Sequence, residues 1–578
     1  WLKVQKKCCH SQCVCLLLPR KLATKFRHCS RTASLVVEGR PMAPKYVLAI
    51  DQGTTSSRAI LFDLEGKPAA ISQQEFTQIY PQPGWTEHDP LEILASVNAT
   101  IEDAMKKVSA SAADVAAIGI TNQRETTVAW DRATGKPLHN ALVWLDLRTA
   151  EVAEKLISAG GQDQFRALTG LPVSTYFSAV KMKWLIENSQ EVASAVAKGT
   201  CLFGTIDSWL MYNLTGGSAH VTDIANASRY MLMDLSTSSW DAGICKELGI
   251  PEASLPEIRS NSEEFGVVKS GPLAGVPISG SLGDQHAALL GQSCLSPGDV
   301  KSTYGTGCFI LMNTGDKPVP SENGLLTTLG WKLGKSAPTT YALEGAVATA
   351  GRGIQWLRDN LKMIKAAPEI GPLATSVPDT GGVTFVPAFS GLLAPHWRPD
   401  ARAALVGMSL HSTNAHVARA MLEGISFQAC DVMRAMESDA TVTLGTLKVD
   451  GGMTMSDQAM QIQADLLGKP LLRAKMPEAT ALGAAFAAGL AVDVWKEPTD
   501  ISTILERAGG ADRFDPLMDT SGREAAQRRW QDAVQRSLGL DAATLASAPR
   551  PGGGTGSSAP APFMWARAVR PLRRLLRH

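Results

Sequence analysis

Short apolar runs separated by polar turns predict a chain in which strands and helices alternate. Residues 46–50 form the first apolar run, residues 51–58 a polar stretch, and residues 59–62 a second apolar run. Two apolar runs joined by a turn that contains Gly53 are typical of neighbouring strands. The turn offers a carboxylate, hydroxyls and a guanidinium, which together can hold a metal ion and phosphate oxygens. An ordinary turn uses the same residue types, so both interpretations stay open here.

The same order of elements recurs about 250 residues later, where residues 300–312 again predict a strand, a Gly/Thr turn and a strand. Self-similarity at this distance indicates an internal duplication. We therefore predict an α/β protein with two domains of one ancestral fold, at residues 45–293 and 294–540. Each domain would offer one turn to a shared central cleft.

Apolar residues at helical spacing, and short apolar runs between turn residues, predict further elements between these turns. The predicted helices cover residues 90–105, 148–166, 179–186, 354–359, 457–467, 479–491 and 528–538. Further predicted strands cover residues 115–120, 127–130, 141–144, 278–283 and 447–450.

Polar residues follow several of these strands, at the edge where open α/β sheets bind ligands. Arg124 and Glu125 come after the strand at 115–120, and Asp284 opens a helix after the strand at 278–283. Structural alternatives exist for each: a surface ion pair of small energetic value for the first two, and a helix N-cap for Asp284. The glycines at 451–452 precede another helix, whose N-terminus can bind an anion.

Composition narrows the functional classes. The chain has 578 residues, 44% hydrophobic and 19% charged, with a net charge of +1, so no global field favours nucleic acid. The longest apolar runs are too short to cross a bilayer, and we expect no stable membrane insertion. Five cysteines are scattered singly and are interpreted as buried thiols in a reducing compartment: Cys201, Cys245, Cys294, Cys308 and Cys430.

The two ends differ from the body of the chain. Residues 1–44 are basic and poor in acidic residues, which suits either an organelle transit peptide or a disordered extension that precedes a start at Met42. Residues 541–578 are rich in Pro, Gly, Ser and Arg and are predicted to be a disordered basic tail. We expect a cytoplasmic protein unless the first segment is a true transit peptide.

Six stretches together resemble the FGGY carbohydrate kinases, and in particular the members that phosphorylate glycerol. The resemblance covers about residues 45–540, and no P-loop motif is present. It implies an actin/hexokinase-type, ribonuclease H-like fold that closes on ATP and glycerol. The stretches that carry it are residues 51–58, 119–126, 283–285, 303–309, 341–345 and 449–452.

The resemblance also implies roles for individual residues, with Asp284 as the catalytic base. Magnesium would be held by Asp51 and Asp284. The residues that would bind glycerol are Arg124, Glu125, Trp144, Tyr176, Asp284, Gln285 and Phe309. The residues that would bind ATP are Thr54, Thr55, Ser56, Arg58, Thr306, Gly351, Gln355, Gly452 and Ser456.

Three positions depart from the family pattern: His286, His396 and Ser456, the last of which stands where an Asn often meets the adenine. Stretches around Trp144 and Tyr176 look more like eukaryotic than bacterial members. Two alternatives are kept: a related kinase for a pentulose or other polyol, and a non-catalytic nucleotide switch of the actin type. A homodimer or homotetramer is possible.

Overall fold

The computed structural model of the protein describes residues 43–540. The predictions made for the tail at 541–578, and for all but the last two residues of the segment at 1–44, lie outside the described residues. Within residues 43–540, no helix is both long and apolar enough to cross a membrane.

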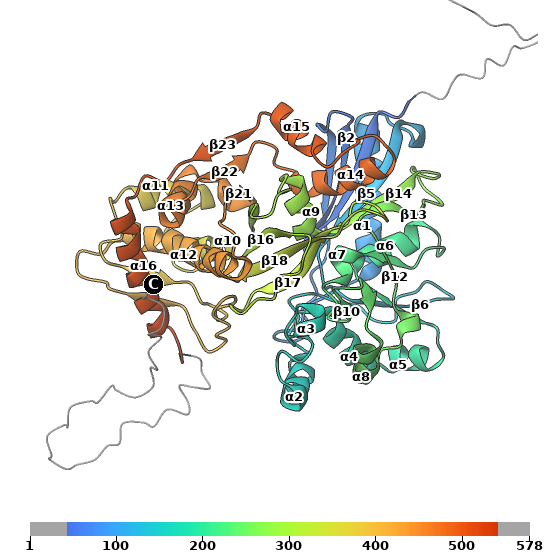
Figure 1. The fold of residues 1–578 in the computed structure, drawn as a ribbon, viewed down its shortest axis with the longest axis horizontal. Coiled ribbons are helices and arrows are strands. Elements are labelled where there is room, and N and C mark those ends of the chain that lie inside the picture. The colour runs from blue at the N-terminus through green and yellow to red at the C-terminus, as the bar shows by residue number, and fades with distance from the viewer. Residues whose placement is uncertain (1–42, 541–578) are drawn as a thin grey trace, which may run out of the picture. The chain divides into compact units, whose positions relative to one another are not determined.

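Two mixed sheets organise the described chain (Figure 1). The first runs in the order β13-β14-β5-β1-β2-β3, and the second in the order β17-β18-β16-β15-β21-β22-β23. The first sheet consists of β1 (Tyr46–Gln52), β2 (Ser56–Asp63), β3 (Pro68–Glu75), β5 (Val115–Asn122), β13 (Ser262–Val267) and β14 (Pro277–Gly283). The second consists of β15 (Val300–Tyr304), β16 (Cys308–Gly315), β17 (Leu326–Trp331), β18 (Thr340–Val347), β21 (Leu447–Asp450), β22 (Leu471–Ala474) and β23 (Ala511–Phe514).

The two sheets repeat one topology. In the first, β1 is antiparallel to β2 and parallel to β5, and β5 is parallel to β14. In the second, β15 is antiparallel to β16 and parallel to β21, and β21 is parallel to β22. Strand β3 pairs antiparallel with β2, and β18 pairs antiparallel with β16 in the same way, with β17 as a further strand beyond β18. This repetition confirms the predicted duplication of an α/β fold, while the predicted boundary at residues 293 and 294 stays a prediction.

Shorter strands and sixteen α-helices complete the described chain. The short strands form two-stranded pairs: β4 (Glu87–His88) with β7 (Ala141–Leu142), β6 (Val128–Asp131) with β8 (Cys201–Gly204), β9 (Val221–Asp223) with β12 (Glu257–Arg259), β10 (Met233–Asp234) with β11 (Ser239–Trp240), and β19 (Thr384–Val386) with β20 (Ala404–Val406). The helices are α1 (Pro90–Lys107), α2 (Ala150–Gly160), α3 (Arg166–Thr169), α4 (Ser178–Asn188), α5 (Gln190–Ala197), α6 (Ile206–Leu214), α7 (Ile224–Ala227), α8 (Ala242–Leu248), α9 (Asp284–Gly291), α10 (Gly351–Asp359), α11 (Ile370–Thr375), α12 (Asn414–Ala440), α13 (Asp457–Leu467), α14 (Ala479–Ala491), α15 (Asp500–Arg507) and α16 (Thr520–Arg536).

Local sequence signals explain where several helices begin. Asp89 caps α1 by accepting a hydrogen bond from the backbone N–H of Leu91 at 2.8 Å, as its place before Pro90 predicts. Helices α13 and α14 have the predicted bounds. The predicted closing helix was too short, because α16 begins at Thr520, where the side chain of Asp519 accepts from the backbone N–H of Gly522.

Two other predictions were wrong in extent. The strand expected at 141–144 forms ladder pairs only over β7, and the helix expected at 148–166 is divided into α2 and α3. The sequence interpretation also missed α12, which at 27 residues is the longest helix among residues 43–540. Nineteen of those residues are buried, so the helix lacks the one-sided apolar pattern that reveals a surface helix.

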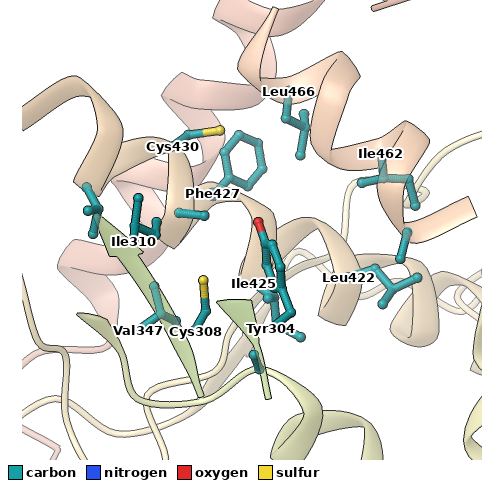
Figure 2. Packing of buried hydrophobic residues seen from close by; sticks show 14 of the residues in the cluster. Tyr304, Cys308, Ile310, Val347, Leu422, Ile425, Phe427, Cys430, Ile462 and Leu466 are labelled. Atoms are coloured by element: carbon teal, nitrogen blue, oxygen red, sulfur yellow. The ribbon is translucent and has the colours of Figure 1, made fainter. Parts of the chain in front are cut away.

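Helix α12 lies in the core that covers the second sheet. Figure 2 shows side chains of β15, β16 and β18 packed against those of α12 and α13. The labelled members are Tyr304, Cys308, Ile310, Val347, Leu422, Ile425, Phe427, Cys430, Ile462 and Leu466. Cysteines 201, 245, 294, 308 and 430 are all free and buried, which confirms the prediction of buried thiols. Burial raises the pKa of each of these thiols to about 12.

Helix α14 follows β22 in sequence but packs on the first sheet, beside β1, β5 and β14 (Figure 1). The contact is made backbone to backbone. A Cβ atom at Gly119 would lie 2.1 Å from the carbonyl oxygen of Ala484, and one at Gly483 would lie 2.0 Å from that of Ala287 on α9. Such distances exclude any side chain, so glycine is required on both sides of the helix.

Replacing Gly483 by Ala tests this close approach. Helix propensity alone would stabilise the variant by about 1 kcal/mol, but the added methyl meets a backbone oxygen that cannot rotate away. We expect Gly483→Ala to lower the free energy of unfolding by at least about 1–3 kcal/mol. Gly445→Ala is the matched control, because a Cβ at Gly445 meets nothing within 4 Å. Equal unfolding midpoints for the two variants in urea would contradict the packing described.

Candidate active site

Strand register brings the polar residues of the first sheet to one edge. Thr121 on β5 is the register partner of Asp51 on β1 and of Leu282 on β14. These three parallel strands therefore end together, with β1 and β14 roughly 10 Å apart on either side of β5. Asp51 lies at this edge, and Arg124 and Asp284 follow their strands directly beyond it.

Arg124 lies buried beyond β5 and is held by two carboxylates. Its Nη1 and Nη2 atoms donate to the two oxygens of Glu344 at 2.5 and 2.9 Å, and its Nε lies 3.3 Å from Oδ1 of Asp284. Glu344 is on β18 of the second sheet and is 0% exposed. Burial opposes the charge of Arg124, but the carboxylates of Glu344 and Glu125 and the hydrogen bond to Glu344 together outweigh it and raise the pKa of Arg124.

Glu125 has a different partner. Its Oε1 accepts from Nε of Arg229 at 2.6 Å, and Nη2 of Arg229 lies 3.3 Å from Oε1 of Glu344. Glu125 has a φ of 58°, a left-handed conformation that non-glycine residues adopt rarely and often at functional sites. Arg124 and Glu125 are both buried, so the alternative of a surface ion pair is wrong. They are also not each other's hydrogen-bond partner, because each is bonded to another residue.

Asp284 is the first residue of α9, and Gly283 rather than Asp284 is the N-cap. Its Oδ1 accepts from the backbone N–H of Gln285 at 2.7 Å, and 29% of its side chain is exposed. Burial raises the pKa of Asp284 to about 6, against the opposing effect of the Arg124 charge. At neutral pH most of this carboxyl group is ionised, and its raised pKa makes it a stronger proton acceptor than an ordinary aspartate.

The side chain of Gln285 connects Asp284 to the second sheet. Its Oε1 accepts from Nζ of Lys301 on β15, and the same ammonium donates to Oγ1 of Thr303 at 3.1 Å. Lys301 is fully buried, and burial lowers its pKa. A buried cation therefore lies beside the predicted base and substrate residues.

Three predicted aromatic residues meet, although they come from separate segments. The rings of Trp144 and Tyr176 are 5.7 Å apart and those of Trp144 and Phe309 are 6.0 Å apart, in edge-to-face geometry. The indole N–H of Trp144 donates to Oγ1 of Thr54 at 3.0 Å. This bond places the aromatic group next to the β1–β2 turn, where the nucleotide residues Thr54, Thr55 and Ser56 were predicted.

Asp51 forms an ion pair with Arg58, its register partner across the same hairpin. Nη1 of Arg58 also bonds to Glu478 at 2.8 Å, and the Asp51 charge raises the pKa of Arg58. The described residues contain no group of three or more likely metal ligands. Mg²⁺ is commonly bound through only one or two carboxylates together with substrate phosphates, so Asp51 and Asp284 at one sheet edge fit such an ion.

The other predicted nucleotide residues lie at the corresponding edge of the second sheet. The turn at Thr306 joins β15 to β16, and the backbone N–H of Gly351 at the start of α10 donates to the carbonyl of Gly305 at 3.0 Å. Gly452 follows β21, and a Cβ there would meet nothing within 4 Å. Thr306, Gly452 and Gln355 on α10 are exposed, as a ligand would require.

The three departures from the family pattern have local partners. His286 is buried, with Nε2 3.4 Å from Oγ1 of Thr328, and burial lowers its pKa well below the usual value. Nε2 of His396 lies 3.1 Å from Oδ2 of Asp431, and the hydroxyl of Ser456 accepts from the backbone N–H of Ala459 as the N-cap of α13. Ser456 thus uses its side chain to cap a helix, as well as lying near the predicted nucleotide residues.

Sequence reasoning missed Glu344, Arg229 and Lys301, which hold the predicted substrate residues. Glu344 lies within the stretch 341–345 that carried the family resemblance, and Lys301 lies in the strand of the second hairpin. A charge in an otherwise apolar strand was the available signal for Glu344, whereas Lys301 lies in a strand that also contains Ser302 and Thr303. Arg229 follows the short helix α7 and belongs to no motif, so only the fold reveals it.

Comparison with known proteins places the chain in a family. The N-terminal domain of the FGGY family of carbohydrate kinases matches residues 46–291, and the C-terminal domain of that family matches residues 300–492. A glycerol kinase of Acidiphilium cryptum is 52% identical over 498 residues, which are 86% of this chain and 99% of that protein. A glycerol kinase of Saccharopolyspora erythraea is 51% identical over 85% of this chain and 99% of its own length. The chain belongs to the FGGY family of carbohydrate kinases.

Solved structures agree with this assignment. A Plasmodium falciparum glycerol kinase with ADP has a TM-score of 0.80 at 40% identity, covering 86% of this chain and 99% of that chain. A xylulose kinase of Lactobacillus acidophilus has a TM-score of 0.76 at 22% identity, covering 87% and 99%, which shows the fold alone. These likenesses confirm the predicted actin/hexokinase-type fold. The likeness of the two short stretches around Trp144 and Tyr176 to eukaryotic members stays a prediction.

The ion pairs of Arg124 can be measured by double-mutant cycles on the free energy of unfolding. We expect Arg124→Met and Glu344→Gln to show a coupling of about 2–3 kcal/mol, because each leaves the other charge buried without its partner. Arg124→Met and Glu125→Gln should couple by less than about 1 kcal/mol, because no hydrogen bond joins these residues. A larger coupling of Arg124 with Glu125 than with Glu344 would show instead that the two residues adjacent in sequence form the ion pair.

Proposed function

We propose that the protein transfers the γ-phosphoryl group of Mg-ATP to glycerol and produces sn-glycerol 3-phosphate. The observation that carries this proposal is the set of buried Arg124 and Glu125 and half-buried Asp284 beside the aromatic group of Trp144, Tyr176 and Phe309. Relatives named glycerol kinase, at 51–52% identity and matched over 97–99% of their own length, support it further.

The polar set suits a small polyol. Glycerol has three hydroxyls, each of which can donate one hydrogen bond and accept up to two. Arg124 offers N–H donors, while the carboxylates of Glu125 and Asp284 accept. A ligand without one of these hydroxyls leaves a buried charged group unsatisfied, which gives strong discrimination. The aromatic rings of Trp144, Tyr176 and Phe309 offer apolar surface to the carbon chain.

Asp284 is assigned the role of general base. Its carboxylate would accept the proton of the reacting hydroxyl while that oxygen forms a bond to the γ-phosphorus and the bond from phosphorus to the ADP oxygen breaks. The Arg124 guanidinium, 3.3 Å from Asp284, holds the carboxylate in place. The buried ammonium of Lys301 adds positive charge on the same side of the site.

Asp51 and Asp284 are the residues that would hold Mg²⁺, which when bound neutralises charge on the phosphate oxygens. The phosphate chain would lie on the turn at Thr54, Thr55 and Ser56 and on that at Thr306. The remaining residues assigned to the nucleotide are Arg58, Gly351, Gln355, Gly452 and Ser456. In the structure Arg58 is bonded to Asp51 and Glu478, so it would act on the nucleotide side through Asp51.

A coupled assay of ADP release tests the proposal. Purified protein with Mg-ATP is given glycerol, xylulose or no acceptor. We expect turnover that depends on glycerol. Turnover with xylulose alone would identify a kinase for another polyol, and the absence of turnover with any acceptor would favour a non-catalytic nucleotide switch.

Assembly as a homodimer or homotetramer and a cytoplasmic location stay predictions. Analytical ultracentrifugation would test the assembly.

Replacing Asp284 by Asn removes the proton acceptor and keeps the shape of the side chain. We expect kcat to fall by about 10²–10⁴-fold, the usual effect of losing a general base. Calorimetry should show that the variant still binds glycerol. A variant with near-normal kcat would show that another group takes the proton.

Replacing Trp144 or Phe309 by Ala removes apolar contacts that are made before the chemical step. Each change should raise the KM for glycerol more than it lowers kcat, because the lost contacts stabilise the bound substrate and the transition state equally. The KM for ATP serves as the internal control and should change little for Phe309→Ala, whose position on β16 faces the aromatic group. Steady-state kinetics with a defect confined to kcat would refute this role.

A further inference from the structure

We propose that Arg229 and Glu344 are positioning residues that set the preference of the site for a substrate with three hydroxyls. The inference rests on the proposed glycerol-phosphorylating function and extends it to two residues outside the predicted site. Neither residue is assigned to contact with substrate here. Both act through the side chains that do make such contact, Arg124 and Glu125.

The structure links five buried or half-buried charged groups in a row of alternating sign. Asp284 lies 3.3 Å from Arg124, and Arg124 donates to Glu344 at 2.5 and 2.9 Å. Glu344 in turn lies 3.3 Å from Arg229, which donates to Glu125 at 2.6 Å. The two ends of the row are the carboxylates assigned to accept from the substrate, and the middle is the single carboxylate of Glu344.

Glu344 fixes both arginines at once. Burial would raise its pKa, but Arg124 and Arg229 outweigh that effect and hold it well below the usual value, so the group is charged. Its fork geometry with Arg124 uses one N–H on each terminal nitrogen. A guanidinium has five N–H groups, so Nε–H and one N–H of each terminal nitrogen stay available toward Asp284 and the substrate.

Arg229 acts on two parts of the substrate site. Besides its bond to Glu125, its guanidinium carbon lies 5.7 Å from the ring centre of Tyr176 and 5.4 Å from that of Phe177. A guanidinium over an aromatic face attracts the ring and limits its motion. The same side chain therefore orients one polar group and one aromatic wall of the site. Lysine cannot do both, because it lacks the planar fork.

A buried pair of amide side chains supports the backbone next to Arg229. The side chains of Asn122, at the end of β5, and Asn226, on α7, donate to each other at 3.1 and 2.9 Å. Asp223 also accepts from the side-chain amide of Asn226 at 2.7 Å. Because Arg229 follows α7 directly, this network fixes its backbone relative to Arg124 and Glu125. Such support from rigid neighbours is what a precise binding geometry requires.

The first test is Arg229→Lys, which keeps the positive charge and loses the fork. We expect kcat/KM for glycerol to fall by about 10²–10³-fold, because an ammonium cannot reproduce the bonds of Arg229 to both Glu125 and Glu344 and leaves a buried carboxylate without its partner. For propane-1,2-diol, which lacks one terminal hydroxyl, the fall should stay below about tenfold, because a loosely held Glu125 no longer penalises the missing group. The ratio of the two kcat/KM values is the decisive measurement.

The second test is Glu344→Gln, which should lower kcat/KM for glycerol at least as much, because it releases Arg124 as well as Arg229. The matched control is Asp431→Asn. Asp431 is a largely buried carboxylate on α12 that accepts from Trp530, His396, Gln527 and Arg434, at 2.7 to 3.3 Å, and touches no site residue. We expect the control to keep both kcat/KM values within about twofold of the unchanged protein.

Binding of ADP, measured by calorimetry, reports whether each variant is folded. Where a single variant fails to bind ADP, the double variant Arg229→Met/Glu344→Gln removes one charge of each sign and takes its place. A lower ratio of glycerol to propane-1,2-diol with ADP binding intact supports the proposal. An equal loss for both substrates, or no loss for either, overturns it. An unchanged protein without glycerol-dependent turnover would instead refute the proposed function, and this result is distinguishable because it appears before any substitution.

Discussion

The contact of one carboxylate with two guanidinium groups is the interaction on which the site depends. Glu344 comes from the second sheet, whereas Arg124 and Arg229 come from segments attached to the first. An arginine buried without a partner is strongly unfavourable, so these charges are satisfied only where the two sheets meet. The predicted substrate residues of the first sheet therefore take their orientation from a carboxylate of the second sheet.

Strand register and small residues complete the geometry. Parallel pairing of β1, β5 and β14 brings Asp51, Arg124 and Asp284 to one edge. The second sheet repeats this arrangement and brings the turn at Thr306 and Gly452 to its own edge. Gln285 and Lys301 then connect the two edges through one hydrogen bond. The site is thus assembled from two copies of one topology, joined by polar contacts between buried side chains.

The sequence alone predicts the local part of this picture. The two hairpins, α13 and α14 were predicted correctly, because their signals lie within a few neighbouring residues. Trp144, Tyr176, Phe309 and Asp284 were predicted from the family resemblance, and the structure brings the three aromatic residues together. The partners of Arg124 and Glu125 were not predicted, since they are 220 and 104 residues away in sequence. Because Arg124 and Glu125 are adjacent in sequence, they were expected to form a pair. In the structure the backbone at Glu125 is left-handed, and the two side chains have different partners. Helix α12 was missed because burial on most sides removes its periodic pattern.

The packing of α14 has a consequence for how the chain is made. During synthesis the strands of the first sheet leave the ribosome long before residues 479–491, which cover one of its faces. Domains usually fold in the order in which they are synthesised. Here the glycine-lined face of the first sheet stays without its helix until nearly the whole second sheet has emerged. A nascent chain stalled near residue 293 would therefore expose this face to solvent, and we expect chaperones to bind it.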